Sequence, residues 1–408
     1  MEIEKMISEA EKELYPIFKK IDDAVFENSK KVINAFHNHC ISEIHFNSTT
    51  GYGYNDIGRD AIERVFAEVL DAESALVRNQ FISGSHALNV AFFSILRPGD
   101  TCLAISGEPY DTLKEVIGIV ENASSLKSFG VEYEQIDLLN DDFDDEKIIE
   151  TLQKKFYKLI HIQRSRGYST RESLSIDKLK RIIEKIKTVS PDSVVMVDNC
   201  YCEMVETSTP TGVGADIMVG SLIKNLGGSI APNGAYIAGK KCYVELAGER
   251  LTLPGEGREV GPSLGINKDF LRGLYMAPSV VGSSLKMVVL ASYLLEKMGC
   301  SVSPRYDEHR SDIVEMITFG NPDKLIQFVQ GIQAGSAIDA NAVPEPTNMP
   351  GYEDKIIMAS GSFVQGSSIE ISADGPLREP YIAYLQGSVT YEYGKIALSR
   401  AIERMMQE

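Results

Sequence analysis

Short apolar segments alternate with helical segments between about residues 74 and 240, and this alternation restricts the fold more than any other feature. The apolar segments typical of strands are SALVRN, TCLAIS, YKLIHIQ, SVVMVD, DIMVGS and GAYIAG. Several of them are separated by helical patterns, namely SHALNVAFFSIL, DTLKEVIGIV, DDEKIIETLQKKF and SIDKLKRIIEKIKTV. Alternation of this kind is typical of βαβ units, so we predict an α/β fold with a largely parallel sheet.

The length of the chain indicates more than one hydrophobic core. It has 408 residues, whereas a single core usually stops growing at about 250–300 residues. The first 36 residues have apolar positions on a helical period, and Pro16 is expected to kink or divide that helix. From about residue 300 the pattern changes to shorter strands and turns. The predicted parts are an N-terminal helical arm (1–50), a large domain (51–299) and a smaller C-terminal domain (300–408).

Charge and composition argue against several classes of function. The net charge of −17 disfavours nucleic acid, because binding to nucleic acid depends on Lys and Arg at the phosphates. No uninterrupted run approaches the roughly 18 apolar residues of a membrane span, and the N-terminus is charged, so we expect a cytoplasmic protein. The six cysteines form neither a CxxC pair nor a Cys/His zinc pattern, so neither metal nor disulfide is expected.

Two predicted strands are followed by candidates for anion binding and charge pairing. In open α/β sheets, ligands bind beyond the carboxyl ends of the strands. After SALVRN, Gly84 and Ser85 open a helix whose amides and dipole favour an anion, although Ser-Gly is also ordinary turn and N-cap chemistry. Asp198 ends the strand SVVMVD, where its carboxylate could pair with a protonated pyridine nitrogen, cap a helix or bind a metal.

The stretch GSLIKNLGG carries a third candidate, Lys224. Most lysines at such positions are solvated loop residues, but a lysine that turns away from a buried strand can also form a Schiff base with a carbonyl. Ser221 precedes it by three residues and could contact the phosphate of the same cofactor. Asp198 and Lys224 should lie at one end of the sheet, because each follows one of two neighbouring strands. Tyr110, after TCLAIS, could stack on a flat cofactor ring or simply cap the next helix.

In this order, the glycine turn, the aromatic residue, the strand-end aspartate and the SxxK lysine resemble the fold-type I pyridoxal phosphate enzymes. The chain is most similar to a bacterial branch of the cystathionine/methionine gamma-lyase-related family, whose members are often called aluminium resistance proteins. The likeness spans nearly the whole chain and rests on GYGYNDIGRD, SGSHAL, EPYDTLKEVIG, QRSRGYSTR, VDNCYCE, GSLIKNLGG and QGSSIEISADGPLREPY. It implies a three-layer αβα large domain, a smaller α+β C-terminal domain, and a homodimer or homotetramer with shared active sites.

The resemblance also implies which residues bind the cofactor, pyridoxal 5'-phosphate. Lys224 would form the Schiff base, Asp198 would hold the ring nitrogen, and Tyr110 would stack on the ring. The phosphate would be bound by Gly84, Ser85 and Ser221.

Further residues would complete the site. The related enzymes use a Tyr-x-Arg element to reach the phosphate of the adjacent subunit, and the matching loop, 45–60, has a different spacing. Its residues are Tyr52, Tyr54 and Arg59, of which Tyr54 would also take part in catalysis. Arg378 would hold the substrate carboxylate in a bidentate pair, with Arg166 and Arg164 as alternatives.

The activity implied by the resemblance is elimination from a sulfur amino acid, which yields a thiol, ammonia and a 2-oxo acid. The amine of Lys224, with its pKa lowered by the site, would remove the Cα proton as general base. Transamination or aldol cleavage would use the same residues. A non-catalytic protein with a role in stress or aluminium resistance is the remaining alternative.

Overall fold

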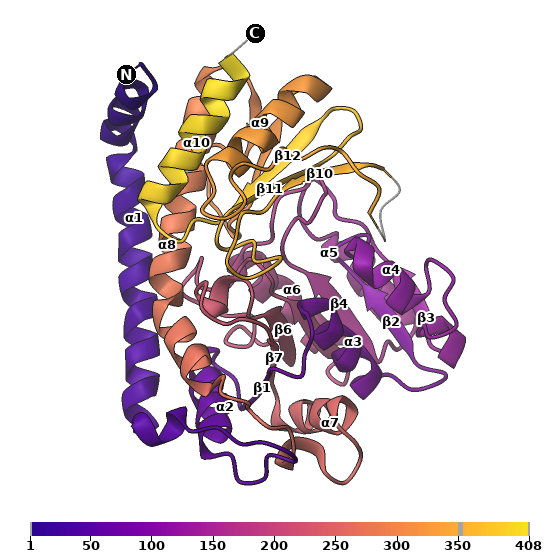
Figure 1. Cartoon of the computed structure of the whole chain (residues 1–408). Coiled ribbons are helices and arrows are strands. Elements are labelled where there is room, and N and C mark those ends of the chain that lie inside the picture. Colours follow the sequence, from indigo (N-terminus) through magenta and orange to yellow (C-terminus); the bar gives the residue numbers. More distant parts are fainter. Residues whose placement is uncertain (1, 350–353, 407–408) are drawn as a thin grey trace.

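The computed structural model describes residues 2–349 and 354–406, and a seven-stranded sheet forms the centre of the large domain (Figure 1). The strands lie in the order β1-β7-β6-β5-β4-β2-β3. Their bounds are Ser74–Arg78 (β1), Thr101–Ala104 (β2), Glu132–Gln135 (β3), Leu159–Gln163 (β4), Val194–Asp198 (β5), Ile217–Ser221 (β6) and Ala235–Gly239 (β7). Strands β3, β2, β4, β5 and β6 pair in parallel, whereas β7 is antiparallel to both of its neighbours. The sheet is therefore mainly parallel, as predicted.

Helices cover both faces of this sheet. One face packs against α3 (Gly84–Ile95), α4 (Asp111–Ile117) and α7 (Lys241–Leu251). The other packs against α2 (Ile57–Val69), α5 (Asp145–Lys154), α6 (Ile176–Val189) and the start of α8 (Asn267–Lys297). Successive residues of β5 enter the two cores in turn, because side chains alternate along a strand. This confirms the three-layer αβα arrangement.

Helix α6 shows how the local sequence produces one of these elements. The Ser175 side chain accepts a hydrogen bond from the backbone N–H of Lys178, which satisfies one free donor of the first turn. The buried side chains that follow repeat at helical spacing along one face, and they are Leu179, Ile182, Ile183 and Ile186. Burial of that face against the sheet stabilises the helix.

The smaller domain has an antiparallel sheet of five strands in the order β10-β11-β12-β9-β8. Its strands are Ser301–Ser303 (β8), Glu315–Thr318 (β9), Ile356–Ala359 (β10), Ser372–Pro376 (β11) and Ile382–Gln386 (β12). Helices α9 (Pro322–Ala334) and α10 (Tyr391–Met406) pack with this sheet in one core, as expected for an α+β domain.

Two long helices connect the two cores. Helix α1 (Glu2–Asn38) runs along α8 and continues through Pro16, so this proline does not divide it (Figure 1). Both helices contribute buried side chains to the large-domain core and to the small-domain core. By length and composition α8 could cross a membrane, but 72% of its most apolar window is buried within the protein. Helix α8 is therefore a core helix.

Two elements of the large domain were not predicted from the sequence. Strand β3 has the polar sequence EYEQ and lies at the edge of the sheet, where its side chains are mostly exposed. Without an apolar run, it has no signal of a buried strand. Helix α7 has few buried residues, Val244, Ala247 and Gly248, which make only a weak helical pattern.

Candidate active site

The carboxyl ends of three neighbouring strands form one edge of the large sheet. Strands β4, β5 and β6 are parallel and adjacent, with Gln163 in register with Asp198 and Asp198 in register with Val219. Ser221 ends β6 two residues later, and Lys224 follows in the next turn. The parallel pairing therefore places Asp198, Ser221 and Lys224 at the same edge.

The turn that carries Lys224 is held against α8 by glycine. Gly228 has φ +54°, and a Cβ atom there would lie 2.3 Å from the carbonyl oxygen of Gly273 in α8. Only glycine adopts this backbone and also permits such a close approach. The close packing of this turn determines where the Lys224 side chain leaves the backbone.

The amine of Lys224 lies over an aromatic ring. Its Nζ is 4.0 Å from the centre of the Tyr201 ring, and it makes no hydrogen bond or ion pair with any residue that the structure describes. Burial alone would lower the pKa of this amine, but attraction by Cys200, Tyr201, Asp198 and Glu203 raises it above its usual range. The lowered pKa is predicted for the amine with cofactor and substrate bound, so it stays a prediction.

Asp198 is a buried carboxyl with few partners of its own. Its Oδ1 accepts a hydrogen bond of 3.1 Å from the backbone N–H of Cys200. Burial raises the pKa of Asp198, although the positive charge of Lys224 acts in the opposite direction. A cation at this carboxyl would therefore compensate for its burial.

Gly84 and Ser221 meet at the start of helix α3. A Cβ atom on Gly84 would lie 3.1 Å from Cβ of Ser221 and 3.4 Å from Sγ of Cys200, so a larger residue would crowd this corner. Ser83 caps the helix by accepting a hydrogen bond from the N–H of His86. The hydroxyl of Ser221 is buried and has no hydrogen-bond partner among the described residues. An unpartnered buried hydroxyl beside a helix N-terminus is suited to an anion.

Ser85 and Tyr110 connect this corner to the start of helix α4. The Ser85 hydroxyl lies 2.8 Å from the hydroxyl of Thr112, a residue that the sequence analysis did not select although it stands two positions after Tyr110. The backbone N–H of Tyr110 donates a 2.7 Å hydrogen bond to the side chain of Gln163 at the end of β4. The Tyr110 ring, 6.3 Å from that of Tyr168, therefore belongs to the same edge of the sheet.

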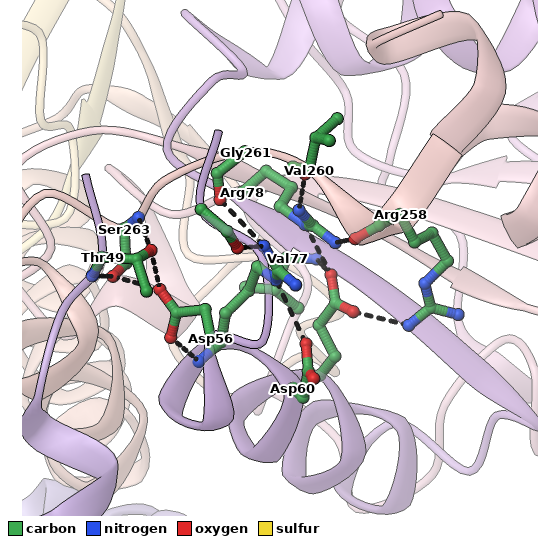
Figure 2. Close-up of polar contacts among 12 residues, drawn as sticks. Thr49, Asp56, Asp60, Val77, Arg78, Arg258, Val260, Gly261 and Ser263 are labelled. Atoms are coloured by element: carbon green, nitrogen blue, oxygen red, sulfur yellow. Dashed lines mark hydrogen bonds and ion pairs between the residues drawn. The ribbon is translucent and has the colours of Figure 1, made fainter. Parts of the chain in front are cut away.

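The loop before helix α2 is held in a different way (Figure 2). Asp56 caps α2 and accepts hydrogen bonds from the hydroxyls of Thr49 and Ser263, each at 2.5 Å. Burial alone would raise the pKa of Asp56, but these hydrogen bonds and that from the N–H of Arg59 hold it below its usual range. The loop is thereby fixed to the segment around Ser263.

Arg59 takes part in this fixation. Its Nη1 donates to the carbonyl oxygens of Gly53 and Gly261, at 2.8 and 3.1 Å, and its Nε contacts Asp60 at 3.1 Å. The side chain is buried. Because the guanidinium is already bonded within its own chain, its surroundings do not favour the predicted contact with a phosphate.

Tyr52 and Tyr54 differ from Arg59 in being exposed. Their side chains are 68% and 53% exposed, and their rings stack with centroids 5.6 Å apart. Both are therefore available to a molecule outside this chain.

A buried ion network lies beside this loop, and its arginines, Arg78 and Arg258, are labelled in Figure 2. Glu63 of α2 pairs with Arg78 of β1 at 2.7 Å and with Arg258 at 2.6 Å. Arg78 also donates to the carbonyl oxygen of Val260 at 2.8 Å. Burial would raise the pKa of Glu63, but the two guanidinium groups lower it. The network joins α2, β1 and the loop 253–265.

The three arginines considered for the substrate carboxylate lie in different environments. Arg378 is 56% exposed between β11 and β12, where it pairs with Asp354 at 3.0 Å. Arg164 is buried and bonded to Leu174, Asn199 and Glu206. Arg166 is also buried, but its guanidinium makes only long contacts, 3.3 and 3.4 Å, with Ser303, and its Nε has no partner among the described residues. These surroundings favour Arg166 over Arg378, and the roles of both stay predictions.

Two residues near Lys224 were missed, although both belong to the quoted segment VDNCYCE. They are Tyr201, which lies under the amine, and Glu203, a buried acid. The signal that could have found Glu203 is an acidic residue five positions after a strand-end aspartate, in a largely apolar segment.

Residues 2–349 and 354–406 contain no group of three or more His, Cys, Asp or Glu side chains placed to hold a metal ion. All six cysteines are free in the structure.

The large αβα domain and the smaller α+β domain together have the fold of the fold-type I pyridoxal phosphate enzymes. Methionine gamma lyase CalE6 of Micromonospora echinospora has this fold: it is 17% identical, with a TM-score of 0.59 over 89% of this chain and 93% of its own. The family described as methionine gamma-lyase matches residues 3–406. The chain belongs to this family.

Two relatives are much more similar. The carbon-sulfur lyase involved in aluminum resistance from Clostridium novyi NT is 47% identical, with a TM-score of 0.95 over 99% of this chain and 96% of its own. The uncharacterized protein YnbB of Bacillus subtilis (strain 168) is 44% identical over all 408 residues, which cover 97% of its length.

Proposed function

We propose that this protein is a pyridoxal 5'-phosphate-dependent carbon–sulfur lyase that converts a sulfur amino acid into a thiol, ammonia and a 2-oxo acid. One observation carries the proposal. The edge formed by β5 and β6 brings together the amine of Lys224, the buried carboxyl of Asp198 and the hydroxyl of Ser221. The amine and the hydroxyl have no hydrogen-bond partner within residues 2–349 and 354–406. The family and the name of the Clostridium novyi relative support this choice of reaction.

The residues at this edge fit the cofactor. Its phosphate suits the N-terminus of α3 at Gly84 and Ser85, together with the free hydroxyl of Ser221. Its ring nitrogen, when protonated, is the cation that the buried carboxyl of Asp198 lacks. When bound, pyridoxal 5'-phosphate supplies an aldehyde that condenses with amines and a ring that accepts electrons from Cα. Tyr110 would cover one face of that ring.

Lys224 is the proposed proton carrier. Its amine would take the proton from Cα of the substrate and return it later in the reaction. The protein by itself favours the charged amine, in part through attraction by Asp198. Pairing of Asp198 with another cation weakens that attraction, so Lys224 can lose a proton more easily when the site is complete.

Arg166 is the proposed anchor of the substrate carboxylate. A buried guanidinium with two long contacts, and with an Nε that has no partner in the described part of the chain, can form a bidentate pair with a carboxylate at little loss of existing bonds. Tyr52 and Tyr54, being exposed, would reach the site of a neighbouring copy in a homodimer or homotetramer, where Tyr54 would contact the reacting groups. The proposed setting is the cytoplasm, with a small amino acid as ligand and without nucleic acid.

The test begins with purified protein and added pyridoxal 5'-phosphate. We expect a visible absorbance band from the imine with Lys224, and its loss in Lys224→Ala. A screen of sulfur amino acids should then release ammonia, thiol and 2-oxo acid together. An unchanged band in Lys224→Ala would overturn the role of the lysine, and a new amino acid as product would indicate transamination or aldol cleavage instead.

A further inference from the structure

A buried acid and a buried tyrosine lie behind the lysine turn. The hydroxyl of Tyr236 in β7 donates a 2.9 Å hydrogen bond to Oε1 of Glu203. Both side chains are buried, and Oε2 of Glu203 has no partner among the described residues. Burial of a carboxylate in such a position lowers the stability of the fold unless a neighbouring positive charge compensates for it. The proposed reaction assigns it no role.

The sheet makes room for this pair at one position. Gly220 of β6 is in register with Tyr236, and a Cβ atom at Gly220 would lie 2.4 Å from both Oε1 of Glu203 and Oη of Tyr236. Any side chain at this position would displace the carboxyl or the hydroxyl. The residue next to Ser221 is therefore glycine because the pair occupies the space beside it.

The pair is connected to Lys224 through the backbone and through charge. Asn225, the residue after Lys224, is fully buried and donates a 2.9 Å hydrogen bond to the carbonyl oxygen of Glu203. The carboxyl of Glu203 also attracts the ammonium group of Lys224. The pair can therefore influence both the position and the charge of the lysine.

The titratable groups that face Glu203 come from three segments. Lys224 lies in the turn after β6, Asp198, Cys200 and Cys202 lie at or just after the end of β5, and Tyr236 lies in β7. Burial raises the pKa of Glu203 to about 7, with Tyr236 and Lys224 acting in the opposite direction. Lys224 is the cation of this set, so the charge of Glu203 acts chiefly on it.

We infer that Glu203, held by Tyr236, is a positioning residue that stabilises the protonated nitrogen of Lys224 and fixes the turn that carries it. This inference rests on the proposed role of Lys224 as the residue that binds the cofactor. Glu203 acts on the reaction only through Lys224. Removal of its charge should therefore lower the pKa of the lysine nitrogen while the protein keeps its fold.

The test is a pH titration of the visible imine band in the protein loaded with pyridoxal 5'-phosphate. Glu203→Gln keeps the shape and the bond to Tyr236 but removes the charge, so the midpoint should fall by about one pH unit. Tyr236→Phe removes the hydrogen bond that favours the charged carboxyl, so it should lower the midpoint by less. The double variant should shift no further than Glu203→Gln, because both changes act through one carboxyl.

Asp374→Asn is the matched control. Asp374 is also buried, and burial raises its pKa to about 7, but it lies in the small domain and is bonded to Tyr168 and Gln386. Its variant should leave the midpoint unchanged. An equal shift in the control, or no shift in either Glu203→Gln or Tyr236→Phe, would overturn the inference.

A second measurement separates this inference from the proposed function. In protein without added cofactor, the rate of acetylation of Lys224 at fixed pH can be followed by mass spectrometry. Glu203→Gln should accelerate it about tenfold, since a fall of one pKa unit increases the neutral amine tenfold. If acetylation of Lys224 accelerates in Glu203→Gln but the protein with added cofactor shows no imine band, the proposed function is contradicted and the inference on Glu203 is not. An unchanged rate would sink the inference whatever the cofactor does.

Discussion

Two regions of the large domain bury charged groups: the sheet edge at Lys224, and the start of α2, where Asp56 caps the helix and Glu63 forms the ion network. They differ in how many hydrogen bonds and ion pairs those groups make. In the network, Asp56 and Glu63 each receive several hydrogen bonds or ion pairs from neighbouring segments (Figure 2). At the edge, Ser221, Glu203 and Asn225 each keep a buried polar atom without a partner among the described residues. Satisfied groups hold a structure in place, whereas unsatisfied ones cost stability and are retained where a ligand completes them.

The largest effect is expected from removal of the Lys224 amine at the sheet edge. Lys224→Ala should lower kcat/KM of the sulfur amino acid reaction by about 10³-fold or more, because the general base is lost. The free energy of unfolding should change little, since the amine makes no hydrogen bond to the described protein. Steady-state assays and urea titration measure the two effects. A stable variant that retains its activity would contradict the comparison.

The second prediction breaks the network instead. Glu63→Gln leaves Arg78 and Arg258 buried without their carboxylate, so the free energy of unfolding should fall by about 3–5 kcal/mol. The folded variant should still form the imine, because Lys224 lies outside this network. Urea titration gives the first value and absorbance the second. If the variant lost the imine band at unchanged stability, the ion network would serve cofactor binding and not stability, contrary to this prediction.

The third prediction uses pH, since the carboxyls of the two regions shift in opposite directions. Folding lowers the pKa of Glu63. Its contribution to stability is therefore fully present above the unfolded pKa and is lost as the pH falls from there through the lower, folded pKa. The pKa of Glu203 is raised to about 7, so the folded protein binds more protons and stability falls as the pH rises from about 4.5 to 7. Glu203 contributes at most about 1.4 kcal/mol per pH unit to this slope, so the slope should become shallower in Glu203→Gln, while Asp374 and Glu315, whose pKa values burial also raises to about 7, keep their share. An identical slope in wild type and variant, measured by urea titration across this range, would refute it.

The smallest effect compares two serines. Ser263 donates to Asp56, so Ser263→Ala should destabilise the protein by about 1–2 kcal/mol. Ser221 has no partner among the described residues, so Ser221→Ala should be nearly neutral for unfolding while it weakens cofactor binding about tenfold. Thermal unfolding and cofactor titration of both variants test the contrast. If both changes destabilised the protein equally, the predicted contrast between Ser263 and Ser221 would be wrong.

Much of the fold follows from local pattern. The six apolar runs all form strands of the large sheet, because residues buried on both faces leave a continuous apolar signal. Strand β3 has no such signal, since an exposed edge strand contributes little to a core. The positions of Asp198 and Lys224 also follow from pattern, because Asp198 ends one strand of the parallel part of the sheet and Lys224 lies in the turn after the next strand.

The selection of arginines shows where local pattern stops being informative. Arg59, Arg166 and Arg378 are the same residue type in polar segments, and nothing local distinguishes their partners. Arg59 is bonded to carbonyl oxygens of Gly53 and Gly261, and Arg378 pairs with Asp354 at the surface. The groups that decide each environment are distant in sequence or belong to other elements.

By itself, the sequence determined the alternation of strands and helices, the strand ends that carry the reactive groups, and the family. These properties depend on side-chain periodicity and on short segments, which a linear chain contains in full. The tertiary structure alone decided which buried polar groups are satisfied, which charged groups surround Lys224, and that Gly220 leaves space for Glu203 and Tyr236. Burial and electrostatic attraction depend on distances between elements, and those distances exist only after the chain has folded.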